Sequence, residues 1–513
     1  MGSLNSKISF KHDSGKVITE NLENGGSETG AQIRKAKLKW MGQRKKNQPG
    51  TAIVKLTDVT EVPQMKLLMT RSWLKRQIVK LLLNGEGGKY LWDLIPRFIL
   101  AECSVRRAME KIPRLEVLLT PLYFSRVRVS QFPTQSTWAM KGISSIPSSW
   151  TVQGMAEIKP PLVSASGPTG HSPTSGVTEV IAGAILEGLA RFHGACWGMG
   201  RSSPLTKWIL DIDPSASTLT LYYPTKFGLC PYHNELPDTN APMAPGGDGR
   251  FTKLNIAKFV SKLGLGLKEI CEPYVDVMKK LQKMYPRIRK EICYVTDGRN
   301  RGNEKSPSRY GYFQTILHGD AHAWNIFWNL EAQKHERIKF IDLTNVGQGR
   351  CAWEVYYFIV QSFHCTDWLQ LHRILAQYYH ALVMSCSPCA RARDGAKFNQ
   401  KPTEGTLSYT HIASTRSDRV QLLSTMPYGS FLREFYLLAL VHTVHIFAEM
   451  NRAGKYVGKS AVKLAKMEQE EGKKGSRVRK DVMYSKIFAK RSLWLAKEIL
   501  ARAGEVISMD LHD

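Results

Sequence analysis

LHGDAHAWNIFWN, residues 317–329, places an acid, two imidazoles and two amides in a run of otherwise small or apolar residues. Polar side chains in such a segment cost desolvation free energy unless they are paired or used. The segment IKFIDL follows at 338–343, and there Asp342 comes near the end of a strand-like apolar run. The pattern therefore indicates functional loops beside buried strands.

Three of these polar residues, Asp320, Asn325 and Asp342, are of the types that bind a hard cation. Mg²⁺ takes carboxylate and amide oxygens, and it needs few of them because it keeps several waters. Phosphoryl transfer uses such a set, in which one Asp orients the acceptor hydroxyl while an Asn and a second Asp hold metal on the nucleotide phosphates. The residues therefore predict magnesium-dependent phosphoryl transfer.

Several segments resemble one family. HGDAHAWN is similar to the HGDxHxxN catalytic loop of the aminoglycoside phosphotransferase and choline kinase superfamily, especially its ecdysteroid kinase-like (CHK kinase-like) branch. IKFIDLTNVGQGRCAWEVYYFI at 338–359 resembles the metal-binding segment and the helix after it, and GLARFHGACW at 188–197 resembles the helix that opens the large lobe. ENGGSETGAQIRKAKLKW followed by PGTAIVKL resembles the Gly-rich turn, strand and Lys-bearing strand.

The resemblance covers most of the chain and implies an α+β, two-lobed protein-kinase-like fold. A small β-rich nucleotide-binding lobe is expected at 1–165, and a larger, mostly helical catalytic and substrate-binding lobe at 166–513. The implied activity is transfer of the ATP γ-phosphate, with Mg²⁺, to a hydroxyl group of a small molecule.

In the large lobe the resemblance makes Asp320 the catalytic base and Asn325 and Asp342 the magnesium ligands. His318 and His322 could suggest a metal pair, but they lack the HExxH order and its general-base Glu. We expect both imidazoles to hydrogen-bond the loop backbone instead.

In the small lobe the resemblance makes Lys55 the residue that holds the α- and β-phosphates, with Glu102 orienting it through an ion pair. Two alternatives stay open: Lys55 as a surface lysine of an edge strand, and Glu86 or Glu110 as its partner. Glycines lack the Cβ that would block the approach of backbone to phosphate. The glycines expected to do so are Gly25, Gly26 and Gly30.

Three features depart from the family pattern. Glu354 in AWEVYYF stands where the family usually has Asp, and we expect the longer side chain to hold the catalytic loop less well. Thr344 stands where Gln, Glu or Trp is usual, and the stretch between Lys55 and Glu102 is long enough for an inserted basic helix at 64–84.

A catalytically degenerate kinase-like binding or scaffold protein is therefore the alternative. A protein kinase fits less well, because no DFG or APE-type segment follows HGD.

Apolar periodicity and turn residues predict the remaining elements. KAKLKW and TAIVKL have the pattern of a strand hairpin around NQPG, and EVLLTPLYFSRVRVSQF also has strand character. The Pro-, Gly- and Ser-rich stretch 160–176 reads as a connector or insertion. Thr366 is the expected N-cap of a helix that continues to 384. Further helices are expected at 95–112, 180–197, 253–285, 430–450 and 481–503.

Composition narrows the class of protein. The 513 residues hold 72 Lys and Arg against 44 Asp and Glu, and the formal charge of +28 favours polyanionic surroundings. The basic residues are scattered, with no aromatic-rich RNA-binding signature and no zinc-finger spacing, so nucleic-acid binding is not indicated. The nine Cys, an odd number found mostly in apolar segments, fit a reducing compartment.

The first residues, MGSLNSK, fit the MGxxxS pattern of N-myristoylation at Gly2, and the opening segment lacks the apolar stretch of a secretory signal. The basic stretch 33–46 is a candidate second membrane signal. FYLLALVHTVHIF at 435–447 is too short to span a bilayer and carries two His, so we expect a buried helix. A cytoplasmic protein with peripheral membrane association through Gly2 is the expectation.

Overall fold

The structure is a computed structural model of the chain. It describes residues 9–12, 15–18, 25–26, 32–37, 51–58, 106–109, 115–128, 150–155, 163–164, 176–196, 254–263, 265–296, 315–329, 338–343, 347–349, 351–363, 365, 367–386, 427–457 and 474–502. Two compact units result, and each is described by itself. The first holds the described segments up to Met155 together with Lys339–Val346, and the second holds the others.

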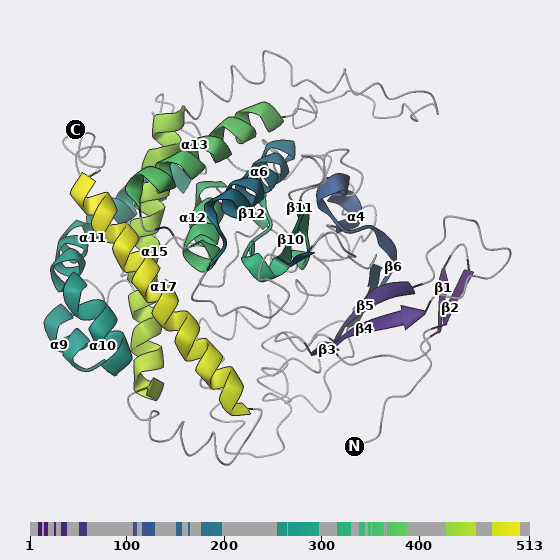
Figure 1. Ribbon diagram of the computed structural model, residues 1–513, viewed down its shortest axis with the longest axis horizontal. Coiled ribbons are helices and arrows are strands. Elements are labelled where there is room, and N and C mark those ends of the chain that lie inside the picture. Colours follow the sequence, from purple (N-terminus) through teal and green to yellow (C-terminus); the bar gives the residue numbers. More distant parts are fainter. Residues whose placement is uncertain are drawn as a thin grey trace, which may run out of the picture. The chain divides into compact units, whose positions relative to one another are not determined.

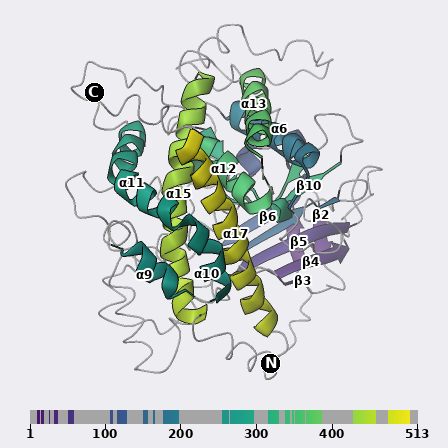
Figure 2. The same cartoon turned by 60° about the vertical axis from the view of Figure 1, so that its left-hand side comes forward.

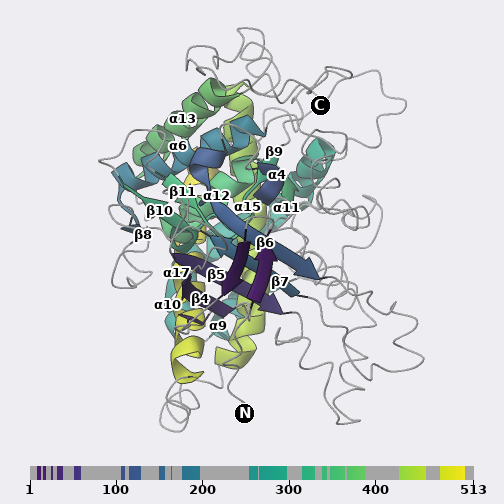
Figure 3. The same ribbon diagram turned by 90° about the vertical axis from the view of Figure 1, so that its right-hand side faces the viewer.

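The first unit is built on a five-stranded antiparallel sheet (Figure 1). Its strand order is β3-β4-β5-β7-β6, and a separate pair is formed by β1 and β2. The strands are β1 (Ser9–His12), β2 (Gly15–Ile18), β3 (Gly25–Gly26), β4 (Gln32–Lys37), β5 (Thr51–Asp58), β6 (Leu122–Arg128) and β7 (Trp150–Met155). The predicted pairing of the strands on either side of NQPG is confirmed, although β4 begins three residues before KAKLKW. Figure 3 shows β5, β6 and β7 from the side.

Strand β5 forms because its sequence alternates small or β-branched residues on one face. Ala52 and Val54 are buried on that face. Lys55 follows on the opposite face and is nevertheless only 5% exposed. A lysine at this depth needs a partner for its charge.

The segment EVLLTPLYFSRVRVSQF contains one strand, and its first residues were wrongly predicted to be part of it. Glu116–Leu118 form a 3-10 turn, η3. Leu118 in it and Leu115 just before it are buried, and β6 begins directly after Pro121. Proline has no backbone N–H to give to a sheet, so it fits the position before a strand. Within the predicted helix 95–112 the structure describes only α4 (Arg106–Met109).

The second unit is mostly helical. Its helices are α6 (Glu179–Ala195), α9 (Ile256–Ser261), α10 (Leu265–Cys271), η5 (Glu272–Tyr274), α11 (Val275–Thr296), α12 (Cys351–Ser362), α13 (Trp368–Ser385), α15 (Tyr428–Val457) and α17 (Lys474–Arg502). Helices α15 and α17 lie side by side in both Figure 1 and Figure 2. Helix α6 packs on α13 closely enough that a Cβ added at Gly194 would lie 2.8 Å from the backbone carbonyl carbon of Ser385.

Two helical predictions can be compared with the structure directly. The N-cap of α13 is Asp367, one residue after the predicted Thr366, because the Asp367 carboxylate accepts hydrogen bonds from the N–H groups of Leu369 and Gln370. The segment 435–447 lies in α15, and the side chains described in it, Phe435 to Val441 and Thr443, are buried, as predicted. Among the described residues, no helix combines the length and the apolar run that crossing a membrane requires.

Short strands frame the loops of the second unit. β9 (Thr315–Leu317) pairs with β12 (Gly347–Gly349), and β10 (Ile326–Trp328) pairs with β8 (Val163–Ser164). The strand β11 (Ile338–Phe340), whose last two residues belong to the first unit, precedes Asp342 in that unit. β8 falls inside the stretch predicted to be a connector. The loop that follows β9 carries HGDAHAWN, so the strands on either side fix both of its ends.

Helix α12 is buried along its whole length, and a residue from the last helix caps its C-terminal end. The Arg491 side chain donates from one Nη to the carbonyl oxygens of Val360, at 3.0 Å, and Gln361, at 2.8 Å. Burial lowers the pKa of Arg491 to about 10, so the guanidinium is still charged at neutral pH. A cation that bonds the last carbonyls of a helix stabilises it both as a cap and through the helix dipole.

Several predictions lie outside the described residues. These are the roles of Gly30, Glu102 and Thr344, the inserted helix at 64–84 and the acylation of Gly2. They remain predictions, as do the functions assigned to 1–165 and 166–513.

Candidate active site

The HGD loop runs from the end of β9 to η6 (Ala323–Asn325), which leads into β10. Gly319 has a φ of 84°, in the left-handed region that L side chains rarely adopt. This explains why glycine stands between His318 and Asp320. The conformation lets the loop turn from the buried strand to Asp320, whose side chain is 22% exposed.

Glu354 of α12 holds the start of this loop. Its carboxylate accepts hydrogen bonds from the backbone N–H of His318, at 2.9 Å, and from that of Gly319, at 2.6 Å. The same carboxylate lies 2.8 Å from Nε2 of His193, and Nδ1 of His193 lies 2.8 Å from the Tyr378 hydroxyl. The longer side chain of Glu354 therefore reaches both N–H groups and a buried imidazole, and the expectation that it holds the loop less well than Asp stays a prediction.

The Asp320 carboxylate has three neighbours. The Tyr357 hydroxyl donates to Oδ1 at 2.7 Å, and the Asn325 amide nitrogen lies 3.3 Å from Oδ2. Nε2 of His322 lies 3.5 Å from Oδ1. Burial raises the pKa of Asp320, but the hydrogen bond and charge of His322 and the bond from Tyr357 outweigh it, so the pKa is lowered from its ordinary value. Asp320 is therefore ionised at neutral pH.

Asn325 is buried and turned toward the loop that precedes it. Its Nδ2 donates to the backbone carbonyl of Asp320 at 3.0 Å as well as to the Asp320 carboxylate. Because the amide nitrogen makes these contacts, the amide oxygen is the atom of Asn325 that suits a cation.

The two histidines of the loop make backbone hydrogen bonds, as predicted. Nδ1 of His318 accepts from the N–H of Asp320 at 3.3 Å, and Nδ1 of His322 accepts from the N–H of Trp324 at 3.2 Å. The proton of a neutral His322 ring then lies on Nε2, which faces Asp320. Both rings therefore brace the loop.

In the first unit the structure brings together Lys55 and Asp342. Nζ of Lys55 donates to Oδ1 of Asp342 at 2.8 Å, and the two side chains are 7% and 29% exposed. Lys55 lies on β5, which has β4 on one side and β7 on the other, so the alternative of a surface lysine on an edge strand is wrong. Asp342 has a φ of 62°, a conformation that Asp and Asn tolerate better than most residues.

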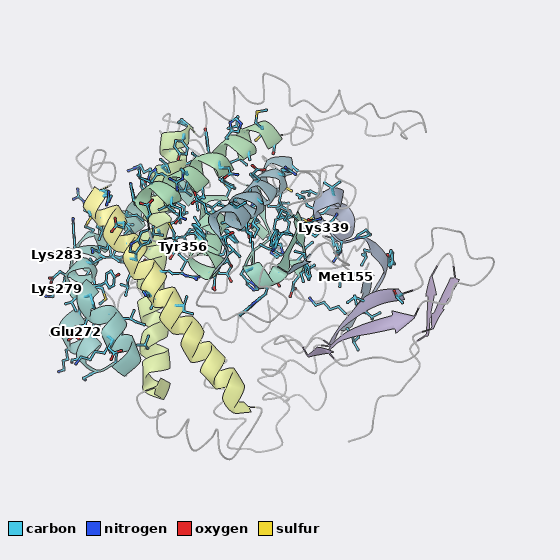
Figure 4. The ribbon with its side chains drawn as sticks, viewed as in Figure 1. Met155, Glu272, Lys279, Lys283, Lys339 and Tyr356 are labelled. Atoms are coloured by element: carbon cyan, nitrogen blue, oxygen red, sulfur yellow. The ribbon has the colours of Figure 1, made fainter. Side chains whose placement is uncertain are left out.

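The segment that carries Asp342 is attached to the first unit by two further contacts. Phe340 forms a parallel bridge with Leu119, and the Lys339 ammonium donates to the carbonyl of Val117. Figure 4 labels Lys339, together with Met155 at the end of β7. These contacts fix the segment that presents the Asp342 carboxylate to Lys55.

Two of the predicted phosphate-approaching glycines lie in β3. Gly25 pairs with Ile33 of β4, and Ile33 in turn pairs with Lys55 of β5. The register therefore places Gly25, Ile33 and Lys55 in one row across three strands of the sheet. That row is consistent with a role for β3 beside Lys55, and the role itself remains a prediction.

Sequence reasoning missed the side chains that surround Asp320 and Glu354. Tyr357 lies three residues after Glu354 on α12, so the two share a face of that helix. Ser362, at the end of the same helix, accepts a hydrogen bond from the N–H of Ala323 at 2.8 Å. His193 is a polar residue inside the apolar helix α6. Two signals were available in the sequence: the i, i+3 spacing of Glu354 and Tyr357, and the imidazole of His193 in a largely apolar segment.

The donor chemistry fits magnesium, and each carboxylate has a protein partner. The carboxylate of Asp342 and the amide oxygen of Asn325 are each of the donor type that Mg²⁺ takes, and neither suits a soft metal. That the two hold one ion remains a prediction. Within the part of the chain that the structure describes, no group of three or more His, Cys, Asp or Glu side chains gathers as a separate metal site.

One protein-family model matches part of the chain. Residues 250–389, which include the HGD loop and α12, match the model of the ecdysteroid kinase-like family. The resemblance inferred from HGDAHAWN to this kinase-like branch is therefore confirmed. No curated protein matches the chain.

Among solved structures, one that matches is amicoumacin kinase hAmiN in complex with AMP-PNP, Ca²⁺ and Ami. It is 9% identical, the match covers 86% of this chain and 88% of that one, and the TM-score is 0.30. A likeness with this TM-score supports no argument about the fold. The α+β content is confirmed by the sheet and helices described above, whereas the two-lobed kinase arrangement remains a prediction.

Proposed function

We propose that the protein is an ATP-dependent phosphotransferase that moves the γ-phosphate to a hydroxyl group of a small molecule. The observation that carries the proposal is the way in which the surrounding residues hold the Asp320 carboxylate. Its carboxylate is partly exposed, ionised and held from two sides, while Glu354 fixes the backbone just before it. A loop built in this way presents a base in a defined orientation.

In the proposed reaction Asp320 accepts the proton of the acceptor hydroxyl while that oxygen forms a bond to the γ-phosphorus. The bond from the γ-phosphorus to the oxygen bridging to the β-phosphate breaks, and ADP leaves. Asn325 and Asp342 would hold Mg²⁺, which when bound supplies positive charge to the phosphate oxygens. Lys55 would hold the α- and β-phosphates, because its ammonium already lies beside the acid assigned to the metal.

The family match supports this proposal, because the matched segment includes Asp320 and Asn325. The contacts of Glu354 also support the phosphotransferase over a degenerate protein. The sequence argument for a degenerate protein rested on Glu354, which makes both loop hydrogen bonds. The identity of the acceptor is the part of the proposal that no described contact addresses.

The test is consumption of ATP by the purified protein with Mg²⁺, measured against a panel of alcohols, sterols, cholines and aminoglycosides. We expect at least one acceptor to raise ADP formation above the level without acceptor, with a phosphorylated product found by mass spectrometry. ATP binding without consumption or product for any acceptor would refute the phosphotransferase and favour the kinase-like binding protein.

A further inference from the structure

Tyr357 contacts Asp320 from outside the HGD loop. It lies on α12, is 3% exposed, and its hydroxyl is 2.7 Å from Oδ1 of Asp320. Its ring stacks on Trp353, with centroids 5.3 Å apart and planes inclined by 15°. Trp353 is itself fully buried, so the phenol is held by packing as well as by its hydrogen bond.

The direction of this hydrogen bond is fixed by chemistry. An ionised carboxylate can only accept, so the phenol must donate. Burial, followed by the neighbouring charge of Asp320, raises the pKa of Tyr357 well above its ordinary value. The phenol therefore keeps its proton over the neutral range and remains a donor.

The other contacts to the Asp320 carboxylate come from within the loop. Asn325 reaches Oδ2 at 3.3 Å and His322 reaches Oδ1 at 3.5 Å, both longer than the bond from Tyr357. Rotation about the Cβ–Cγ bond of Asp320 would exchange the two oxygens, and a short bond to one oxygen opposes it. Of the contacts described, the one from Tyr357 is the shortest and links the carboxylate to a buried helix.

We propose that Tyr357 is a positioning residue that fixes the Asp320 carboxylate in the orientation needed to accept the acceptor proton. The inference rests on the proposed phosphotransferase function. Helix α12 then orients the loop through two residues of one helix face. Glu354 holds the loop backbone, and Tyr357 holds the Asp320 side chain. Losing the phenol oxygen should slow transfer without weakening nucleotide binding.

A matched control lies next to it. Tyr356 is also a buried tyrosine of α12, but its hydroxyl pairs with the Ser492 hydroxyl of α17, at 3.2 Å (Figure 4). Tyr356→Phe and Tyr357→Phe therefore remove the same atom from adjacent buried positions. Only the second change touches Asp320.

The experiment compares kcat and the KM for ATP of these variants and the wild type, using the best acceptor of the panel. We expect Tyr357→Phe to lower kcat about tenfold, the equivalent of one hydrogen bond to a charged group, with KM for ATP unchanged. Tyr356→Phe should keep the wild-type kcat. Equal kcat values for Tyr357→Phe and the wild type would overturn the inference, as would a loss of kcat of the same size in both variants.

A second measurement does not depend on turnover. In a double-mutant cycle, Tyr357→Phe and Asp320→Ala should be coupled by at least about twofold in the unfolding equilibrium constant, whereas Tyr356→Phe and Asp320→Ala should not be coupled. Absence of coupling at Tyr357 would refute the contact. A wild type that transfers phosphate to no acceptor would refute the proposed function and, with it, the catalytic part of this inference. An active wild type with an unaffected Tyr357→Phe would refute the inference alone.

Discussion

Glu354 and His193 are both fully buried, and Oε2 of the first lies 2.8 Å from Nε2 of the second. Helices α6 and α12 thus meet through a buried polar contact. The contact matters for the loop, because the same carboxylate accepts from the N–H groups of His318 and Gly319. The substitution of Glu for the usual family Asp is accommodated by an imidazole that meets the longer side chain.

The first prediction concerns this carboxylate. Glu354→Gln should lower the free energy of unfolding by about 1–3 kcal/mol, because one amide hydrogen would face a buried donor and leave a polar group unsatisfied. Urea denaturation measures the loss. Glu272→Gln, at an exposed glutamate of η5, is the control and should change stability by less than about 0.5 kcal/mol. Equal stability of the Glu354 variant and the wild type would show that the carboxylate does not hold the loop.

The second prediction concerns the proposed base. Asp320→Asn keeps the size of the side chain and can still accept from Tyr357, but it removes the basic carboxylate. Transfer should fall by about 10²- to 10⁴-fold while ATP affinity is retained. Rapid-quench assays and equilibrium nucleotide titration measure the two quantities. Loss of ATP binding together with activity would instead make Asp320 a structural residue.

The third prediction concerns the proposed metal ligand. Asp342→Asn should abolish magnesium-supported turnover with the fold intact, because Asn tolerates the φ of 62° but carries no charge to balance a cation. Turnover is measured over a range of Mg²⁺ concentrations, with circular dichroism to check folding. The exposed Asp276→Asn on α11 serves as control and should behave as the wild type does. Normal magnesium-dependent turnover of the Asp342 variant would rule out the assignment.

The fourth prediction concerns Lys55. Lys55→Met keeps most of the apolar stem at a site that is 5% exposed, and it removes the ammonium that lies on Asp342. ATP affinity should fall by about 10- to 100-fold, the value of a charge-assisted hydrogen bond. Isothermal titration with ATP measures it, and the exposed Lys279→Met is the control. Unchanged affinity and rate would mean that another lysine serves the phosphates.

The fifth prediction concerns membrane association. We propose that Gly2 is myristoylated, since MGSLNSK fits the acylation pattern. The intact mass of protein expressed in eukaryotic cells should then show loss of Met1 and gain of the acyl group. The Gly2→Ala variant should not gain the acyl group. One acyl chain alone binds membranes weakly, so sedimentation with anionic vesicles should depend on salt if the basic stretch contributes. An unmodified mass for the wild type ends the proposal.

The sequence was sufficient for features that depend on residue type and spacing. The strand pair around NQPG, the buried helix at 435–447 and the backbone-bonding roles of His318 and His322 were all predicted. Residue type does not decide which of two adjacent residues has a role when both are suited to it. Thr366 and Asp367 are both good N-caps, and only the path of the chain selects Asp367.

The same limitation explains the missed site residue. Tyr356 and Tyr357 are identical in type and adjacent, so the sequence does not tell which of them faces Asp320. The answer depends on the rotation of α12 about its axis, which is set by packing of the whole helix. Likewise the sequence did not indicate that Asp342 contacts Lys55, because the two are 287 positions apart, and the predicted pairing with Glu102 lies outside the described residues.

The cap on α12 has a consequence for how the protein is made. Arg491 lies 131 residues beyond Val360, whose carbonyl it bonds. When α12 has just left the ribosome, the nascent chain does not yet contain Arg491. A product of a premature stop codon before position 491 also lacks it. The helix that orients the HGD loop therefore gains this support only after Arg491 has been synthesised.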